Sequence, residues 1–300
     1  MNSLKLASVS VLDRASGIFD RLDVAEATRT DHKWRIGAFV RFMDGRPLTH
    51  DSYLEFKRYL ANRNDLSIST KNKYLCSARV LLKELARRGA LPQDLTLNVR
   101  LFQQSKKHKR EGVTEEEMAQ LAAHLRELPA TPTNLRLKAL IALLGLQGLR
   151  QIEVQRLNVV DLDLVARTAL VQGKGRDDKE PVDLHPQTIH ALRDYLKAAR
   201  IADGPVFPSR HHSRSYERLT LRAIHQIVSE AFAEVGIDKT PHGLRHFFTT
   251  TLLKRYKGDL LEVRRYTRHA GNEMLNIYDD RIKQQADLPR FFGAFKEYAL

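Results

Sequence analysis

The segment HGLRHFFTTTLLKRY, which begins at His242, combines histidine and arginine at the start of what should be a helix. Thr240 and Pro241 precede it, and these residue types are typical of an N-cap and of a proline in the first turn. His242 and Arg245 are three residues apart, so they would share one helix face at the positive end of the helix dipole. The segment therefore predicts a site for an anion, above all a phosphate.

A metal site is the alternative for the same segment, because His242 and His246 have the four-residue spacing of a zinc-binding pair. The glutamate that should follow the first histidine is absent, and Gly243 stands in its place. Arg245, between the two histidines, would repel a cation. We therefore expect no metal and no other cofactor.

Two further cations lie in settings that could bind a ligand. In QGLRQIEVQRL, Arg150 follows a strongly apolar segment, where an arginine is usually either paired or functional. Glu153 is one helical turn away, and the spacing leaves a structural Arg150–Glu153 pair and a functional arginine equally open.

Lys174 lies between two glycines at the tip of a predicted hairpin, where the backbone could approach a ligand closely. A lysine at a loop tip is ordinarily exposed and without function.

The segment YTRHAGNEMLNIYDDR places His269 nine residues before Tyr278, with a polar turn between them. Tyrosine is a poor nucleophile at its ordinary pKa of about 10, so a catalytic tyrosine needs neighbours that stabilise its phenolate. The other candidates would supply them if they converge: Arg150, Arg245, His242 and His269. Tyr266 is three residues before His269, and we expect it to belong to the core.

Composition and charge favour a partner that is a polyanion. The chain has 300 residues, a length that favours two globular domains over one. Hydrophobic residues are 42% of the total, enough for a core in each domain. Its net charge is +14, and nucleic acid is the commonest polyanion in a cell. Residues 1–104 hold 18 Lys and Arg against 11 Asp and Glu, and residues 105–112 hold 4 against 1. A protein that is merely basic, or that binds acidic proteins, is the alternative.

The sequence also gives an expectation of where the protein works. No apolar run approaches the roughly 18 residues that span a bilayer, and the N-terminal residues lack the features of a signal peptide. The single cysteine excludes an internal disulfide, which suits a reducing compartment. We expect a cytoplasmic protein without a membrane partner.

Hydrophobic periodicity predicts a mainly α fold with a small antiparallel β-sheet. The basic, aperiodic segment 105–112 is interpreted as a linker between an N-terminal helical domain, 1–104, and a second domain, 113–300. The sheet is expected from two or three short strands within 159–185, and Thr114 and Glu117 form a capping-box pattern. Helices are expected over residues 28–45, 49–63, 69–88, 113–125, 133–148, 186–200, 219–235, 241–256, 259–267 and 288–299. In the helix over 69–88, Ser69 and Thr70 are the expected caps, and basic residues off the apolar stripe suggest a face toward phosphates: Lys71, Lys73, Lys83, Arg87 and Arg88.

Taken in order, the motifs resemble the signature set of the tyrosine recombinases, the phage-integrase family. The set comprises Gly-Leu-Arg with a glutamate after it, the Gly-Lys-Gly hairpin, His-x-x-Arg-His, and a histidine nine residues before a tyrosine. The resemblance covers residues 113–300 well and the first third more loosely. There are two departures. Arg268 stands where the family usually has glycine, and Met274, Leu275 and Asn276 stand where threonines are frequent.

The resemblance implies a helical, SAM-like core-binding domain that clamps DNA, and a mixed α+β catalytic domain. It implies a site-specific DNA recombinase of a mobile element or a chromosome, which would integrate, excise or resolve DNA through a 3′-phosphotyrosyl intermediate on Tyr278. Arg150 and Arg245 would bind the phosphate, Lys174 would protonate the leaving oxygen, His242 would accept the tyrosine proton, and His269 would donate a hydrogen bond to the phosphate. No metal is required by this chemistry.

The expected partner is double-stranded DNA carrying the recombination sites, on which the family assembles as a homotetramer. Two alternatives remain open on the sequence. A type IB topoisomerase-like enzyme would share the chemistry but relax DNA as a monomer. A regulator could keep the fold and bind DNA without catalysis.

Overall fold

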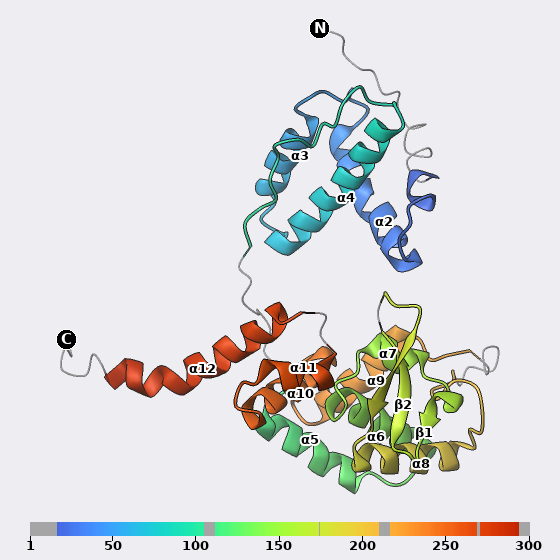
Figure 1. Ribbon diagram of the computed structural model, residues 1–300. Helices are drawn as coiled ribbons and strands as arrows, with labels where there is room; N and C mark the ends of the chain where they lie inside the picture. The colour runs from blue at the N-terminus through green and yellow to red at the C-terminus, as the bar shows by residue number, and fades with distance from the viewer. Residues whose placement is uncertain (1–16, 105–111, 174, 210–216, 269–270, 294–300) are drawn as a thin grey trace. The chain divides into compact units, whose positions relative to one another are not determined.

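The computed structural model describes residues 17–104, 112–173, 175–209, 217–268 and 271–293 (Figure 1). The chain divides into two compact units, residues 1–106 and 107–300. The division falls inside the segment interpreted as a linker, most of which lies outside the described residues. As predicted, the described part is mainly helical with one small antiparallel sheet.

The first unit packs helices α2 (Glu26–Met43), α3 (Ser52–Ala61) and α4 (Ile68–Arg87) around an aromatic core. Phe39 and Phe56 meet edge to face, with ring centroids 5.0 Å apart. Helix α4 begins at Ile68, one residue before the expected range of 69–88. Its N-cap is Ser67, whose side chain accepts a hydrogen bond from the Thr70 backbone, so the prediction of Ser69 and Thr70 as caps is wrong.

The predicted basic face of α4 is also partly wrong. Lys71 is buried, and its Nζ donates to the carbonyl of Ala61 at 3.0 Å, where the end of α3 leaves that oxygen available. Arg87 and Arg88 both pair with Glu84. These three cations are therefore engaged within the unit. Lys83 is exposed but lies 3.8 Å from Asp94, and Lys73 is the other exposed lysine of the set.

The second unit surrounds the apolar helix α6 (Pro132–Gly145) with α8 (Pro186–Ala199), α9 (Leu221–Glu234) and α10 (His242–Arg255). Helix α6 is buried over most of its surface, which explains its nearly continuous apolar sequence. Helix α5 (Glu115–Glu127) precedes it, and the predicted capping box is confirmed. The Thr114 hydroxyl accepts from the Glu117 backbone at 3.1 Å, and the Glu117 carboxylate accepts from the Thr114 backbone at 2.8 Å.

The sheet is antiparallel in the order β1-β2-β3, with β1 Leu162–Asp163, β2 Thr168–Gln172 and β3 Lys179–Asp183. Leu170 pairs with Pro181 in the register between β2 and β3. The short helix α7 (Gln151–Arg156) and the 3₁₀ turn η1 (Val159–Asp161) lead into this sheet. Arg156 donates to the carbonyl of Gly173 at 3.0 Å, so the end of β2 is tied to α7.

Helices α10, α11 (Leu260–Thr267) and α12 (Glu273–Gly293) follow one another along one side of this unit (Figure 1). Helix α10 begins at His242 with Pro241 at its N-cap, so the expectation that Thr240 caps it is wrong by one residue. The predicted last helix, 288–299, is helical over residues 288–293, but its predicted start is wrong. The helix α12 begins at Glu273, and residues 294–299 lie outside the described part.

Candidate active site

The loop between α6 and α7 delivers Arg150 to the start of α7. Gly148 has φ of +59°, in the left-handed region that favours glycine. A Cβ at this position would lie 2.2 Å from Cδ1 of Phe248, so the ring on α10 leaves no space for a side chain. The chain turns sharply here and places Arg150 at the N-cap of α7.

Arg150 and Glu153 form the pair that their spacing suggested. The Glu153 carboxylate accepts from the backbone N of Arg150 at 2.8 Å and from its Nη1 at 2.7 Å. Glu153 is 1% exposed, whereas the Arg150 side chain is 32% exposed. The carboxylate therefore fixes the direction of a guanidinium that is still accessible to a ligand.

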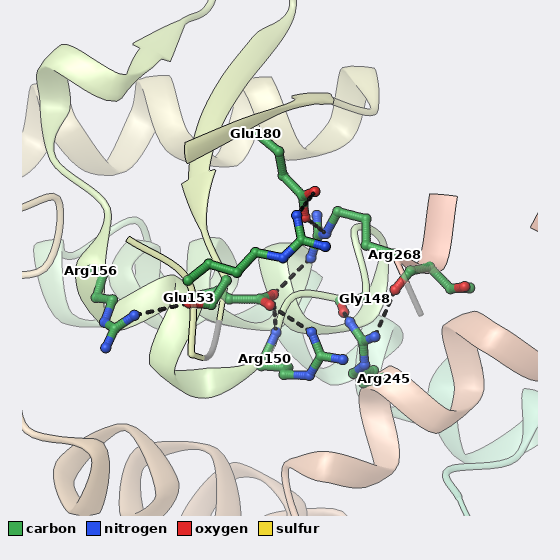
Figure 2. A network of polar contacts seen from close by, with 10 residues as sticks. Gly148, Arg150, Glu153, Arg156, Glu180, Arg245 and Arg268 are labelled. Carbon is green, nitrogen blue, oxygen red and sulfur yellow. Dashed lines mark hydrogen bonds and ion pairs between the residues drawn. The ribbon is translucent and has the colours of Figure 1, made fainter. Parts of the chain in front are cut away.

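Arg245 lies beside Arg150 on the neighbouring helix α10 (Figure 2). It is 4% exposed, and it donates to the carbonyls of Gly148 and Thr267, the latter at 2.7 Å. Burial lowers the pKa of Arg245 to about 10, and the positive charge of Arg150 acts in the same direction. Arg245 is still protonated at neutral pH, but the site destabilises its charge, and a bound anion would reverse that effect.

Tyr278 lies on α12, close enough to Arg245 to be influenced by its charge. Burial raises the pKa of the Tyr278 phenol, and the Arg245 guanidinium opposes that shift. The side chain is 6% exposed and packs with Leu253, Val263 and Leu275. Its ring meets His246 edge to face, with centroids 4.5 Å apart. Both rings line a pocket of about 380 Å³ at the start of α5.

Of the other three predicted site residues, the structure describes only His242. His242 is exposed at the first position of α10, one turn before Arg245. Lys174 and His269 lie outside the described residues, so their predicted roles stay predictions. In sequence they adjoin described residues that matter: Gly173 receives the hydrogen bond from Arg156, and Arg268 ends α11.

Sequence reasoning missed Arg268, which it treated only as a departure from the family pattern. Its side chain is 8% exposed and pairs with Glu153 at 2.7 Å and with Glu180 on β3 at 3.2 Å (Figure 2). Glu153 is 115 residues away in the chain, so no local spacing could reveal the contact. Tyr266 was expected in the core, but it is exposed and packs against Tyr256, so that prediction is wrong.

Four guanidinium groups thus lie around two carboxylates near the end of α11. Glu153 and Glu180 are the carboxylates, and the arginines are Arg150, Arg176, Arg245 and Arg268. The excess of positive charge suits an anion with several oxygens, such as a phosphodiester, and the two carbonyls fix the orientation of Arg245. Within the described ranges, no group of three or more His, Cys, Asp or Glu side chains could hold a metal ion. None of the helices there has the length and apolar character that crossing a bilayer requires.

Comparison with known proteins connects this site to one family. The profile described as "Phage integrase family" matches residues 111–285, more than half of the chain. The tyrosine recombinase XerC of Lactobacillus delbrueckii subsp. bulgaricus is 30% identical over 226 residues, which cover 73% of this chain and 74% of the relative.

Solved structures share the fold. The XerH site-specific recombinase bound to a palindromic difH substrate, in a post-cleavage complex, superposes with a TM-score of 0.71 at 18% identity, covering 97% of this chain and 85% of that one. A lambda integrase tetramer bound to a Holliday junction superposes with a TM-score of 0.67 at 16% identity, and the match covers 90% of this chain and 79% of that one. The profile match and the curated relative establish the relationship, and the chain belongs to the phage integrase family of tyrosine recombinases.

Proposed function

We propose that the protein is a site-specific DNA recombinase that cleaves and rejoins strands through a 3′-phosphotyrosyl intermediate on Tyr278. The observation that carries the proposal is the juxtaposition of Arg150 and Arg245, fixed by separate partners, with the Tyr278 phenol within the electrostatic influence of Arg245. Family membership supports the reaction class.

In the proposed cleavage step, the Tyr278 oxygen attacks a DNA phosphorus. The bond from that oxygen to phosphorus forms, and the bond from phosphorus to the 5′-oxygen breaks. Arg150 and Arg245 bind the non-bridging oxygens and stabilise the charge that they gain in the transition state. Rejoining is the same reaction in reverse, with a 5′-hydroxyl of the partner strand as the nucleophile, so the phosphate ester bond is conserved and no ATP is needed.

Proton transfers are assigned to the remaining residues of the set. A phenol with the ordinary pKa of about 10 is neutral at physiological pH, and burial raises the pKa of Tyr278 further. The attack therefore needs a base, for which His242 is proposed. Lys174 is proposed to give a proton to the leaving 5′-oxygen. His269 is proposed to donate a hydrogen bond to the phosphate.

The proposed roles of the two domains follow from the distribution of positive charge along the sequence. Residues 1–104 would clamp the duplex and residues 105–112 would run along its backbone, because the excess of Lys and Arg is concentrated there. Residues 113–300 would form the catalytic domain. We further propose that four copies assemble on two DNA sites, as four do in the lambda integrase tetramer on a Holliday junction. The cytoplasm is the proposed location.

The test works without a defined DNA site. The protein is incubated with a library of random-sequence duplexes, and DNA that stays attached to protein in denaturing detergent is captured and sequenced. We expect an enriched sequence with wild-type protein and with Tyr266→Phe, and none with Tyr278→Phe. If the protein binds DNA but no DNA is captured covalently, the proposal of an enzyme is refuted, and the alternative of a DNA-binding regulator without catalysis is favoured.

The recovered sequence then separates the two enzyme classes. It is placed twice in one supercoiled plasmid, and the products are analysed by sequencing across the junctions. Exchange between the two copies supports a recombinase. Relaxation without exchange would support the topoisomerase-like alternative instead.

A further inference from the structure

Arg268 occupies a backbone position that disfavours it. It ends α11 with φ of +53°, in the left-handed region, where an ordinary side chain is strained and glycine is not. Such strain persists when the surrounding contacts compensate for it. At Arg268 those contacts are the ion pairs to Glu153 and Glu180, made by a side chain that is largely buried.

These contacts belong to a longer series. Five side chains of alternating charge, which we call the charge ladder, run from the tip of the β2–β3 hairpin to the candidate active site: Arg176, Glu180, Arg268, Glu153 and Arg150. Arg268 is the central member, and the only one of the five that comes from the end of α11. Without it the ladder separates into two ordinary local pairs, Arg176–Glu180 and Arg150–Glu153.

The end of α11 therefore contacts Arg245 directly and Arg150 through Glu153. The carbonyl of Thr267 accepts directly from Arg245 at 2.7 Å. The next residue, Arg268, holds the Glu153 oxygen Oε2 at 2.7 Å, while the other oxygen of that carboxylate, Oε1, holds Arg150 at 2.7 Å (Figure 2). The Oε2 oxygen also accepts from the Arg150 backbone N at 2.8 Å, so Arg268 adds a third contact to this carboxylate. The orientation of the carboxylate in turn sets that of the Arg150 guanidinium.

We propose that Arg268 is a positioning residue, which acts through Glu153 to hold Arg150, and through Glu180 to hold β3, in the geometry that phosphodiester transfer requires. The inference rests on the proposed function for its reaction, but its structural part does not. Arg268 itself is not assigned contact with the DNA.

The substitution that isolates this role is Arg268→Gly, because glycine removes the guanidinium and suits the left-handed backbone. Arg200→Gly is the matched control. Arg200 also ends a helix, α8, with φ of +55°, but it is exposed and makes no contact with the ladder. Both variants should fold, so a defect that only Arg268→Gly shows cannot come from relief of backbone strain.

The first measurement does not depend on catalysis. Nitrogen-15 relaxation of the arginine side-chain Nε–H groups reports how rigidly each guanidinium is held. We expect Arg150 to lose order in Arg268→Gly while Arg245, held by two backbone carbonyls, keeps it. Unchanged order at Arg150, or equal loss at Arg150 and Arg245, would overturn the proposal.

The second measurement is the single-turnover rate of covalent adduct formation on a nicked DNA substrate, with DNA affinity measured in parallel. Arg268→Gly should slow the rate between about tenfold and a hundredfold with affinity unchanged, since misplacement of a catalytic group costs that much. Arg200→Gly should match wild type.

A double-mutant cycle shows whether the effect passes through Arg150. In an Arg150→Lys background, Arg268→Gly should cause little further slowing, because the group that it positions has already gone. Full additivity of the two losses would contradict the route through Glu153. If wild-type protein forms no adduct with any DNA, the proposed function fails, and the relaxation measurement still decides whether Arg268 positions Arg150.

Discussion

Replacing Gly148 with alanine should destabilise the second unit more than an ordinary glycine-to-alanine change, because two costs fall on this position. Its φ of +59° is unfavourable for alanine by about 1–2 kcal/mol. The new Cβ would also lie 2.2 Å from the Phe248 ring, and overpacking of this kind costs about 1–3 kcal/mol. The sum is about 2–5 kcal/mol, a large part of the 5–15 kcal/mol that stabilises a typical domain.

Gly204→Ala is the control that separates the two costs. Gly204 lies in the same unit with φ of +69°, but nothing lies within 4 Å of the Cβ that alanine would add. It should cost only about 1–2 kcal/mol. The double variant Gly148→Ala with Phe248→Ala should recover part of the Gly148→Ala loss, once the cost of Phe248→Ala alone is measured.

Chemical denaturation followed by far-UV circular dichroism measures these free energies of unfolding. The single tryptophan, Trp34, lies in the first unit, so its fluorescence reports that unit separately and should not change. Equal losses for Gly148→Ala and Gly204→Ala would refute the argument that the Phe248 ring restricts the loop before Arg150.

Three further outcomes follow from other parts of the chain. Thr114→Ala removes the capping box of α5 and should cost about 1 kcal/mol of unfolding free energy in the second unit, measured by the same denaturation; no change would contradict the cap. Because burial raises the pKa of Tyr278, the stability that this group confers is complete below pH 10 and is lost above it. Tyr278→Phe should therefore lose less stability than wild type in that alkaline range, and parallel curves would contradict the shift. Replacing the four Lys and Arg of residues 105–112 with glutamine should reduce the slope of log affinity for DNA against log salt by up to about 3.6. An unchanged slope would contradict the proposal that the linker contacts the DNA backbone.

Local sequence signals predicted much of the fold where one segment supplied all the information. The Thr114–Glu117 capping box and the short antiparallel strands within 159–185 are confirmed. The cap of α4 was wrong because Ser67, Ser69 and Thr70 are chemically similar, and only the backbone geometry selects Ser67. The start of α12 was missed although Leu275 and Tyr278 already had helical spacing.

At the candidate site, the sequence predicted one local ion pair but not the contacts between distant segments that hold the arginines. The spacing of Arg150 and Glu153 permitted their pair, and the structure shows it. Lys71 was predicted on a basic surface, yet its long side chain reaches a carbonyl at the end of α3, which no periodicity within α4 could indicate. Arg268 was equally hidden, since both of its carboxylate partners come from distant parts of the chain.

The central claim is that the Tyr278 oxygen attacks a phosphorus held by Arg150 and Arg245. Covalent complexes captured from the duplex library can be digested with nuclease and protease, and the modified peptide sequenced by mass spectrometry. We predict a nucleotide 3′-phosphate attached to Tyr278, and no adduct in an Arg245→Ala variant that still folds. A nucleotide on Tyr266 or on any other residue would contradict the account.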